Sequence, residues 1–303
     1  MADEVVPPTL QELLGYPPDA RLLLINFDDA GMCHAVNQAL TPVFSAGLVQ
    51  SCTVMVPSPW FPEFVALKRE NPRIHCGVHL TVTSEWKNYR WGPVAGADRV
   101  PSLVDDDGYF HASEFEFLRR ADRREVEIEF RAQIERALRY DLAPTHVDSH
   151  MGAYHLDEDN FQVARSLAEE YGLTMRIVYP PRKEALRRLG WAVVDRVVFD
   201  SYEIPLGQRE EFYRENLRRL EPGVTELLIH CAVDSAELRA ICRSTWSHRV
   251  FDFDFFTSPA TKRFLADEGI VCIGYHQLQQ LHRQRVEKSQ ETTADSIREG
   301  GRT

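Results

Sequence analysis

Short, continuous apolar runs alternate with segments of helical periodicity along most of the chain. Such runs are typical of parallel strands buried on both faces. They occur at residues 21–27, 49–56, 74–80, 145–150, 175–179, 226–231 and 270–273. Helix-like segments cover residues 35–44, 62–69, 114–140, 160–171, 208–220, 236–242 and 259–266.

This alternation predicts an α/β fold with a parallel sheet. About seven or eight strand–helix units can close such a sheet, so we expect a single-domain (β/α) barrel with some distortion. An open doubly wound sheet is the main alternative. The barrel is predicted over residues 19–282, because no Ser/Gly-rich linker divides the chain. Residues 1–18 are expected to form a leader on the surface, and residues 283–303 a polar tail.

Composition narrows the class of protein. The 303 residues are 44% hydrophobic and 27% charged, as in ordinary globular proteins. A net charge of −11 disfavours nucleic acid and anionic membrane surfaces as partners. No apolar stretch is long enough to span a bilayer and no signal peptide is recognisable, so a cytoplasmic location is expected. The six scattered cysteines predict reduced thiols rather than disulfides or a structural zinc site.

The first candidate site residues are Asp28 and Asp29, which follow the first apolar run and precede Gly31. Consecutive residues of an extended chain point in opposite directions, so one carboxylate could bind a metal while the other handles a proton. Alternatively, both cap the following helix, a position that Asp favours.

Histidines mark the ends of three further runs. His79 lies in an apolar segment, where a lone histidine is most often a satisfied core residue. His146, Asp148 and His150 recur with a period of two, which places all three on one face of a strand. Burying such groups is costly unless they are paired or hold a metal, although a polar outer face is the simpler alternative. His155 lies five residues further on, and His230 ends another run.

Residues at the carboxyl ends of barrel strands converge on one mouth. Aspartate and histidine together suit Zn²⁺ or another first-row divalent ion, and such an ion favours hydrolysis by acidifying a water and polarising a carbonyl. A carboxylate would take the proton from water and a histidine would give one to the leaving group. Asp28 and His230 fit these two roles.

The segments at residues 26–31, 77–80, 145–150 and 226–230, in this order and spacing, resemble the YdjC-like carbohydrate deacetylases, the ChbG/HpnK family. The resemblance implies a metal-dependent (β/α)-barrel hydrolase that removes an acetyl group from a small N-acetylated saccharide or glycoconjugate. By position it implies that one divalent ion, zinc or magnesium, binds Asp29, His79 and His150. It also implies Asp28 as general base, His230 as general acid, and His146 and Asp148 as groups that orient the ligands.

Other positions bear on the substrate. Arg176 stands where the family tends to have an arginine near the site, whereas Gly152 replaces a family histidine. An insert after residue 80 carries Trp86, Tyr89 and Trp91, which suit stacking against a sugar ring. The alternative is an apolar plug that packs this loop onto the barrel.

A sugar-binding barrel without turnover is one alternative function, because a fold alone does not imply activity. A metal-dependent hydrolase of another amide or ester is the other. The sequence also allows a homo-oligomer.

Overall fold

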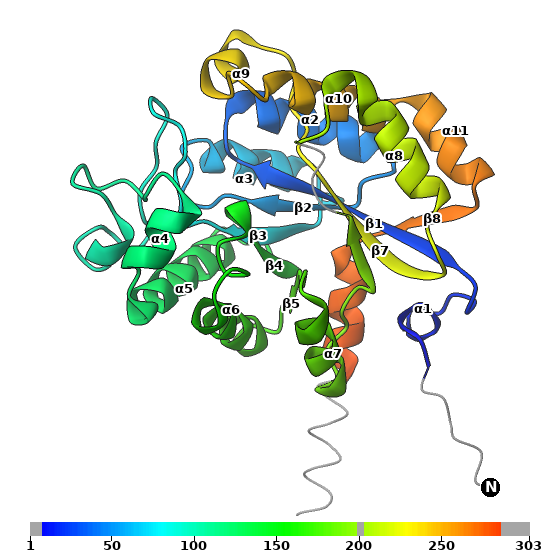
Figure 1. The fold of residues 1–303 in the computed structure, drawn as a ribbon, viewed down its shortest axis with the longest axis horizontal. Coiled ribbons are helices and arrows are strands. Elements are labelled where there is room, and N and C mark those ends of the chain that lie inside the picture. The colour runs from blue at the N-terminus through cyan, green and yellow to red at the C-terminus, as the bar shows by residue number, and fades with distance from the viewer. Residues whose placement is uncertain (1–7, 199–202, 286–303) are drawn as a thin grey trace, which may run out of the picture.

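The computed structural model describes residues 8–198 and 203–285, and its core is one sheet of eight parallel strands (Figure 1). The strands are β1 (Arg21–Ala30), β2 (Ser51–Val54), β3 (Cys76–Leu80), β4 (His146–Ser149), β5 (Thr174–Met175), β6 (Arg196–Val198), β7 (Gly223–Ile229) and β8 (Ile270–Ile273). All of the pairings between them are parallel, in the order β5-β4-β3-β2-β1-β7-β6.

The sheet curls into a half-barrel around β1, which confirms the predicted barrel-like α/β fold. One side of β1 pairs with the whole of β7, over residues 21–27 of β1. Its other side pairs first with β8 and then, beyond residue 25, with β2. Strand β1 therefore lies at the centre of the sheet, and its carboxyl end is surrounded by the ends of its neighbours.

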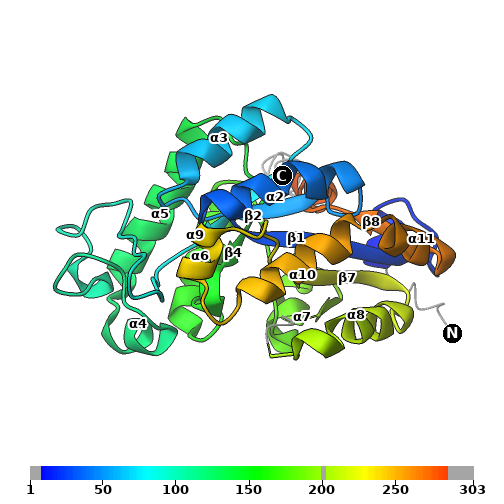
Figure 2. The ribbon, with the colours of Figure 1, turned by 90° about the horizontal axis from the view of Figure 1, so that it is seen from above.

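Helices cover the outer face of this sheet, with α2 and α3 on one side and α6, α7 and α8 on the other (Figure 2). They are α1 (Leu10–Leu13), α2 (His34–Ala46), α3 (Phe61–Glu70), α4 (Glu114–Arg120), α5 (Arg123–Arg139), α6 (Glu158–Glu170), α7 (Pro180–Arg188), α8 (Arg209–Arg218), α9 (Ala236–Ile241), α10 (Trp246–Thr257) and α11 (Pro259–Asp267). The helix predicted over residues 114–140 is two helices, because Asp122 caps a new one with a hydrogen bond to the backbone N–H of Arg124.

The alternation of side chains along β1 explains how the interior is filled. Leu23, Ile25 and Phe27 belong to the large core beneath the helices, whereas Leu22 and Leu24 belong to a separate cluster. Residues of one parity share one face of a strand. The inward column of β1 therefore runs from leucine at the base of the barrel to Asn26 and Asp28 at the mouth.

Helix α1 lies in the predicted leader, and Leu10, Leu13 and Leu14 pack against the interior cluster of Leu22 and Leu24. This contact closes the base of the barrel. Residues 1–7 and 286–303, which include most of the predicted tail, lie outside the described residues. All six cysteines are unbridged, as expected. Over residues 8–198 and 203–285, no helix is long and apolar enough to cross a bilayer.

A long connection between β3 and α4 carries the aromatic insert and is anchored by one buried carboxyl. Glu129 of α5 accepts hydrogen bonds from the backbone N–H groups of Val94 and Ala95, at 3.0 and 2.9 Å, and from Nε2 of Gln133 at 2.8 Å. Burial raises the pKa of Glu129 to about 7 in spite of these donors. The anchor of the insert is therefore sensitive to pH.

We predict that this carboxyl makes the protein less stable as the pH rises from about 4.5 to 7. In that window the unfolded chain has lost the Glu129 proton and the folded chain still holds it, so the free energy of unfolding falls by on the order of 3 kcal/mol. Denaturant unfolding of the parent and of Glu129→Gln across this range checks the effect. The parent-minus-variant difference should fall as the pH rises, and a constant difference would contradict the assignment.

Candidate active site

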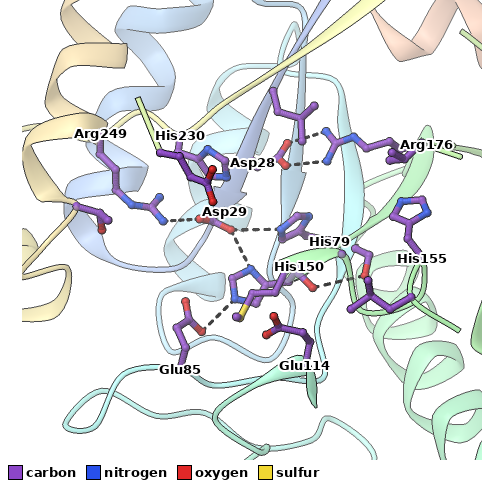
Figure 3. A pocket seen from close by; sticks show the side chains of 18 of the residues that line it. Asp28, Asp29, His79, Glu85, Glu114, His150, His155, Arg176, His230 and Arg249 are labelled. Atoms are coloured by element: carbon purple, nitrogen blue, oxygen red, sulfur yellow. Dashed lines mark hydrogen bonds and ion pairs between the residues drawn. The ribbon is translucent and has the colours of Figure 1, made fainter. Parts of the chain in front are cut away.

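A cavity of about 1080 Å³ opens at the carboxyl ends of the strands. Its walls include Asp28, Asp29, His79, Glu85, Trp86, Glu114, His150, His155, Arg176, Tyr179, Arg182, His230 and Arg249. Figure 3 shows the two aspartates near the centre, Arg176 on one side and Arg249 on the other. The structure thus brings together the residues that the sequence placed at separate strand ends.

The end of β1 is shaped by a change of backbone conformation. Asp29 has a φ of 65° and Gly31 a φ of 82°, and the register between β1 and β2 shifts between Phe27 and Ala30. A left-handed conformation is tolerated by Asp better than by most other residues, at a cost of about 1 kcal/mol or more. As a result, the carboxylates of Asp28 and Asp29 face different partners instead of capping the next helix, which begins at His34.

Asp28 is held by a buried arginine. The Nη1 and Nη2 atoms of Arg176 donate to the two carboxylate oxygens of Asp28 at 2.7 and 2.8 Å. Arg176 also contacts Asp148 Oδ2 at 2.8 Å and donates from Nε to Glu226 Oε1 at 2.7 Å. One guanidinium therefore links the ends of β1, β4 and β7.

These contacts set the charges of the group. Burial would raise the pKa of Asp28, but the Arg176 cation outweighs it and keeps that pKa well below its ordinary value. Burial raises the pKa of Glu226, which lies deeper and accepts a hydrogen bond from the Tyr275 hydroxyl at 2.7 Å. Asp28 is thus ionised at neutral pH and lies at the floor of the cavity.

Asp29 stands between two histidines. Its Oδ1 lies 3.2 Å from Nε2 of His79 and 3.2 Å from Nδ1 of His150. Each ring has a second carboxylate on its other nitrogen: Asp148 Oδ1 lies 2.5 Å from Nδ1 of His79, and Glu85 Oε2 lies 3.1 Å from Nε2 of His150. When His79 Nδ1 and His150 Nε2 carry protons and donate them to Asp148 and Glu85, His79 Nε2 and His150 Nδ1 have no proton. The lone pairs of these two nitrogens then face Oδ1 of Asp29.

The carboxylates around His79 and His150 favour positive charge on these two rings. Burial alone lowers the pKa of a histidine, but Asp148 and Asp29 raise the pKa of His79 to about 10, and Glu85 and Asp29 raise the pKa of His150 to about 9. A cluster that attracts protons so strongly also attracts a cation. Two imidazole nitrogens and a carboxylate oxygen are ligands that zinc and similar ions bind, and the 3.2 Å separations suit ligands about 2.0–2.2 Å from one ion.

A second group of possible metal ligands is formed by Asp28, His79 and Asp148. Arg176 already pairs with both oxygens of Asp28 and with Asp148, and its charge repels a cation. His79 Nδ1 is also engaged by Asp148. The group of Asp29, His79 and His150 is therefore the better cation site of the two.

The sequence pattern missed the residue that neutralises Asp29. Arg249 of α10 donates from Nη2 to Asp29 Oδ2 at 2.6 Å and is buried. No helix was predicted over Trp246–Thr257, because aromatic residues obscure its periodicity. The same helix supplies Asp252, whose Oδ2 accepts the backbone N–H of His230 at 3.1 Å. Glu85, Glu226 and Arg182 carried no sequence signal beyond their charge.

Two other predicted residues occupy distinct positions. His230 lines the cavity, and Figure 3 shows it beside Asp28 and Asp29. His146 lies deeper: Nδ1 contacts Thr145 Oγ1 at 2.9 Å, and its ring stacks on Tyr275 at a centroid distance of 3.6 Å. Asp148 contacts His79 directly, as an orienting group would, whereas these contacts of His146 are not with the cation cluster.

The structure separates the three aromatic residues of the insert. Trp86 lines the cavity, whereas Trp91 is 2% exposed and donates from Nε1 to the Thr83 carbonyl at 2.8 Å. Trp91 packs edge-on against Trp86, at 5.5 Å between ring centroids, and against His150, at 6.1 Å. The Tyr89 hydroxyl donates to the Met32 carbonyl at 2.5 Å. Trp91 therefore packs the loop onto the barrel, as the plug alternative expects. Trp86 lines the cavity, where it is placed to contact a sugar.

The fold and the site define an α/β half-barrel protein with a carboxylate and histidine cluster at its mouth. The model of the YdjC-like protein family matches residues 22–267, and the chain belongs to this family. A carbohydrate deacetylase of Thermus thermophilus is 35% identical over 82% of this chain and 90% of its own length. A carbohydrate deacetylase of Geobacillus stearothermophilus is 31% identical over 86% and 99%.

A solved structure from Enterococcus faecalis V583, provisionally named a cellobiose-phosphate cleavage protein, has the same fold. Its TM-score is 0.74 at 27% sequence identity, over 86% of this chain and 99% of that one. The chain therefore covers between 90% and 99% of the length of these three relatives.

Proposed function

We propose that this protein is a metal-dependent hydrolase that removes the acetyl group from an N-acetylated saccharide. The observation that carries the proposal is the adjacency of Asp28, a buried carboxylate that is ionised at neutral pH, to the cation cluster of Asp29, His79 and His150. Relatives that match most of this chain are named carbohydrate deacetylases, which supports a saccharide substrate.

Asp29, His79 and His150 would hold one divalent ion, with zinc or magnesium as the first candidates. Bound there, such an ion supplies Lewis acidity, which polarises an acetyl carbonyl and makes a water more acidic. Asp148 and Glu85 fix the two imidazole rings, and Arg249 balances the charge of Asp29. A carboxylate behind a ligating histidine is the usual way in which proteins orient that ligand.

Proton transfer falls to the chain's own side chains. Asp28 is ionised at neutral pH and is held in one orientation by Arg176, so it can take a proton from water. His230 lies beside it in the cavity wall and can give a proton to the departing amine. The cavity is at the upper end of the roughly 300–1,000 Å³ range of small-molecule sites, which leaves room for more than one sugar ring.

We predict one divalent ion per chain, lost from Asp29→Ala and from His150→Ala and retained by Asp28→Asn. The first two substitutions remove a ligand, whereas the third leaves all three ligands in place. Elemental analysis and zinc titration of the purified variants measure this. Parent-like zinc affinity in Asp29→Ala and His150→Ala would rule out this ligand set, whatever happened to activity.

Acetate release from a panel of N-acetylated mono- and disaccharides tests the proposed activity. Asp28→Asn and His230→Ala should keep the metal and the fold but lose turnover by about 10²-fold or more, the usual scale for a general base or acid. Near-parental turnover in both would move proton transfer to other residues. Hydrolysis of esters or other amides, without any N-acetyl sugar, would replace the substrate class.

The two tryptophans should respond differently to truncation. Trp91→Ala removes a buried ring and should lower the free energy of unfolding by about 3–5 kcal/mol. Trp86→Ala should weaken saccharide binding with little change in metal content, because the ring faces the cavity. Unfolding and saccharide titration of both variants decide the matter. Unchanged saccharide affinity in Trp86→Ala would exclude the platform.

The cytoplasmic location and a homo-oligomeric assembly remain predictions.

A further inference from the structure

His155 lines the cavity, and within the described part of the chain its ring has no hydrogen-bond partner. Both ring nitrogens are buried, and neither has a partner among residues 8–198 and 203–285. The backbone around it is fixed, since its N–H donates to the Gly152 carbonyl at 2.8 Å and its carbonyl accepts from Arg182 Nη1 at 2.9 Å. The ring also packs on Tyr154, at a centroid distance of 4.2 Å.

An imidazole without partners is costly to keep. Most buried polar side-chain atoms in folded proteins have at least one hydrogen bond, and a buried group left without one costs about 1–3 kcal/mol. A phenyl ring would make the same packing contact with Tyr154 at no such cost. The cavity wall therefore contains a donor and an acceptor that no residue of the described part of the chain uses.

The electrostatic surroundings set the protonation state of the His155 ring. Burial, together with the charges of Arg176 and Arg182, lowers the pKa of His155 to about 3, so the imidazole is neutral at physiological pH. A neutral imidazole offers one N–H donor and one nitrogen acceptor. A hydroxyl group matches both, whereas an anion such as a phosphate ester could use only the donor.

The position of His155 separates it from the metal chemistry. Figure 3 places it on the Arg176 side of the cavity, with Asp28, Asp29 and His79 between this side and Arg249. Among the described residues it belongs to neither cluster of three possible metal ligands. Its partner is therefore expected to be a part of the substrate away from the bond that is cleaved.

We propose that His155 is a specificity-determining residue that binds a hydroxyl group of the saccharide substrate. This inference rests on the proposed function for its saccharide ligand. His155 would select among sugars by the position of one hydroxyl and would take no part in proton transfer.

Saccharide binding tests the proposal without requiring turnover. N-Acetylglucosamine, N-acetylgalactosamine and their disaccharides are titrated calorimetrically into zinc-loaded full-length protein carrying Asp28→Asn, with and without His155→Phe or His155→Gln. We expect His155→Phe to weaken the best-bound saccharide about tenfold with unchanged zinc content and no loss of thermal stability. His155→Gln, which restores a donor and an acceptor, should recover part of the affinity.

Monodeoxy analogues of that saccharide identify the contact. One deoxy position should weaken binding to the protein with His155 and have no effect in the His155→Phe variant, because the partner is already gone. His276→Phe is the matched control. His276 also has a ring nitrogen for which the described residues offer no partner, but it stacks on His75 beside a separate cavity. It should leave the affinity unchanged.

Two results would overturn the role of His155: affinity within twofold of the parent in His155→Phe, or deoxy effects that all persist in that variant. A lack of binding by every saccharide would overturn it as well. Absence of acetate release by the parent, with His155-dependent saccharide binding intact, would instead reject only the proposed hydrolysis.

Discussion

The charge of Arg176 in the barrel interior is the constraint on which the site depends. Three buried carboxylates, those of Asp28, Asp148 and Glu226, surround this single guanidinium. Buried charges are tolerated only when they are paired, and removing one partner of such a pair typically costs about 3–5 kcal/mol. Because the carboxylates belong to β1, β4 and β7, satisfying Arg176 also fixes where the ends of these strands lie relative to one another.

The pairing with Arg176 gives Asp28 different surroundings from Asp29, the next residue in the chain. Both carboxylate oxygens of Asp28 accept hydrogen bonds from Arg176. The left-handed backbone at Asp29 directs its side chain to other partners, which are His79, His150 and Arg249. Arg176 occupies both oxygens of Asp28, whereas Arg249 pairs with Oδ2 of Asp29 and Oδ1 faces the two imidazole rings, so a cation is better accommodated at Asp29. The proposed roles, Asp28 as general base and Asp29 as metal ligand, would follow from the placement of these two arginines.

The sequence was sufficient for the parts of the structure that repeat. The positions of most buried strands along the chain follow from apolar runs, and side chains at strand ends converge in any parallel barrel, so Asp28, His79, His150 and His230 could be predicted to meet. Strand β6 has only three residues, too few to form a recognisable apolar run. Helix α7 begins with two prolines, which fit the first turn of a helix but in a sequence usually indicate the end of one. Neither was predicted.

The hydrophobic pattern of the sequence could not identify residues that pair with a charge far away in the chain. Arg249 reaches Asp29 across 220 positions, and no local signal distinguishes it from an arginine on an exposed helix. Trp86 and Trp91 are equally aromatic and five residues apart, yet one lines the cavity and the other is core. Only the packing of the loop against α5 and the barrel decides between them.

Anomalous diffraction from crystals grown with zinc would test the central claim, that Arg176 directs the cation to Asp29 rather than to Asp28. The account predicts one strong peak in contact with Asp29 Oδ1, His79 Nε2 and His150 Nδ1, with Arg176 still paired to Asp28. A peak among Asp28, His79 and Asp148, with Arg176 displaced, would contradict it.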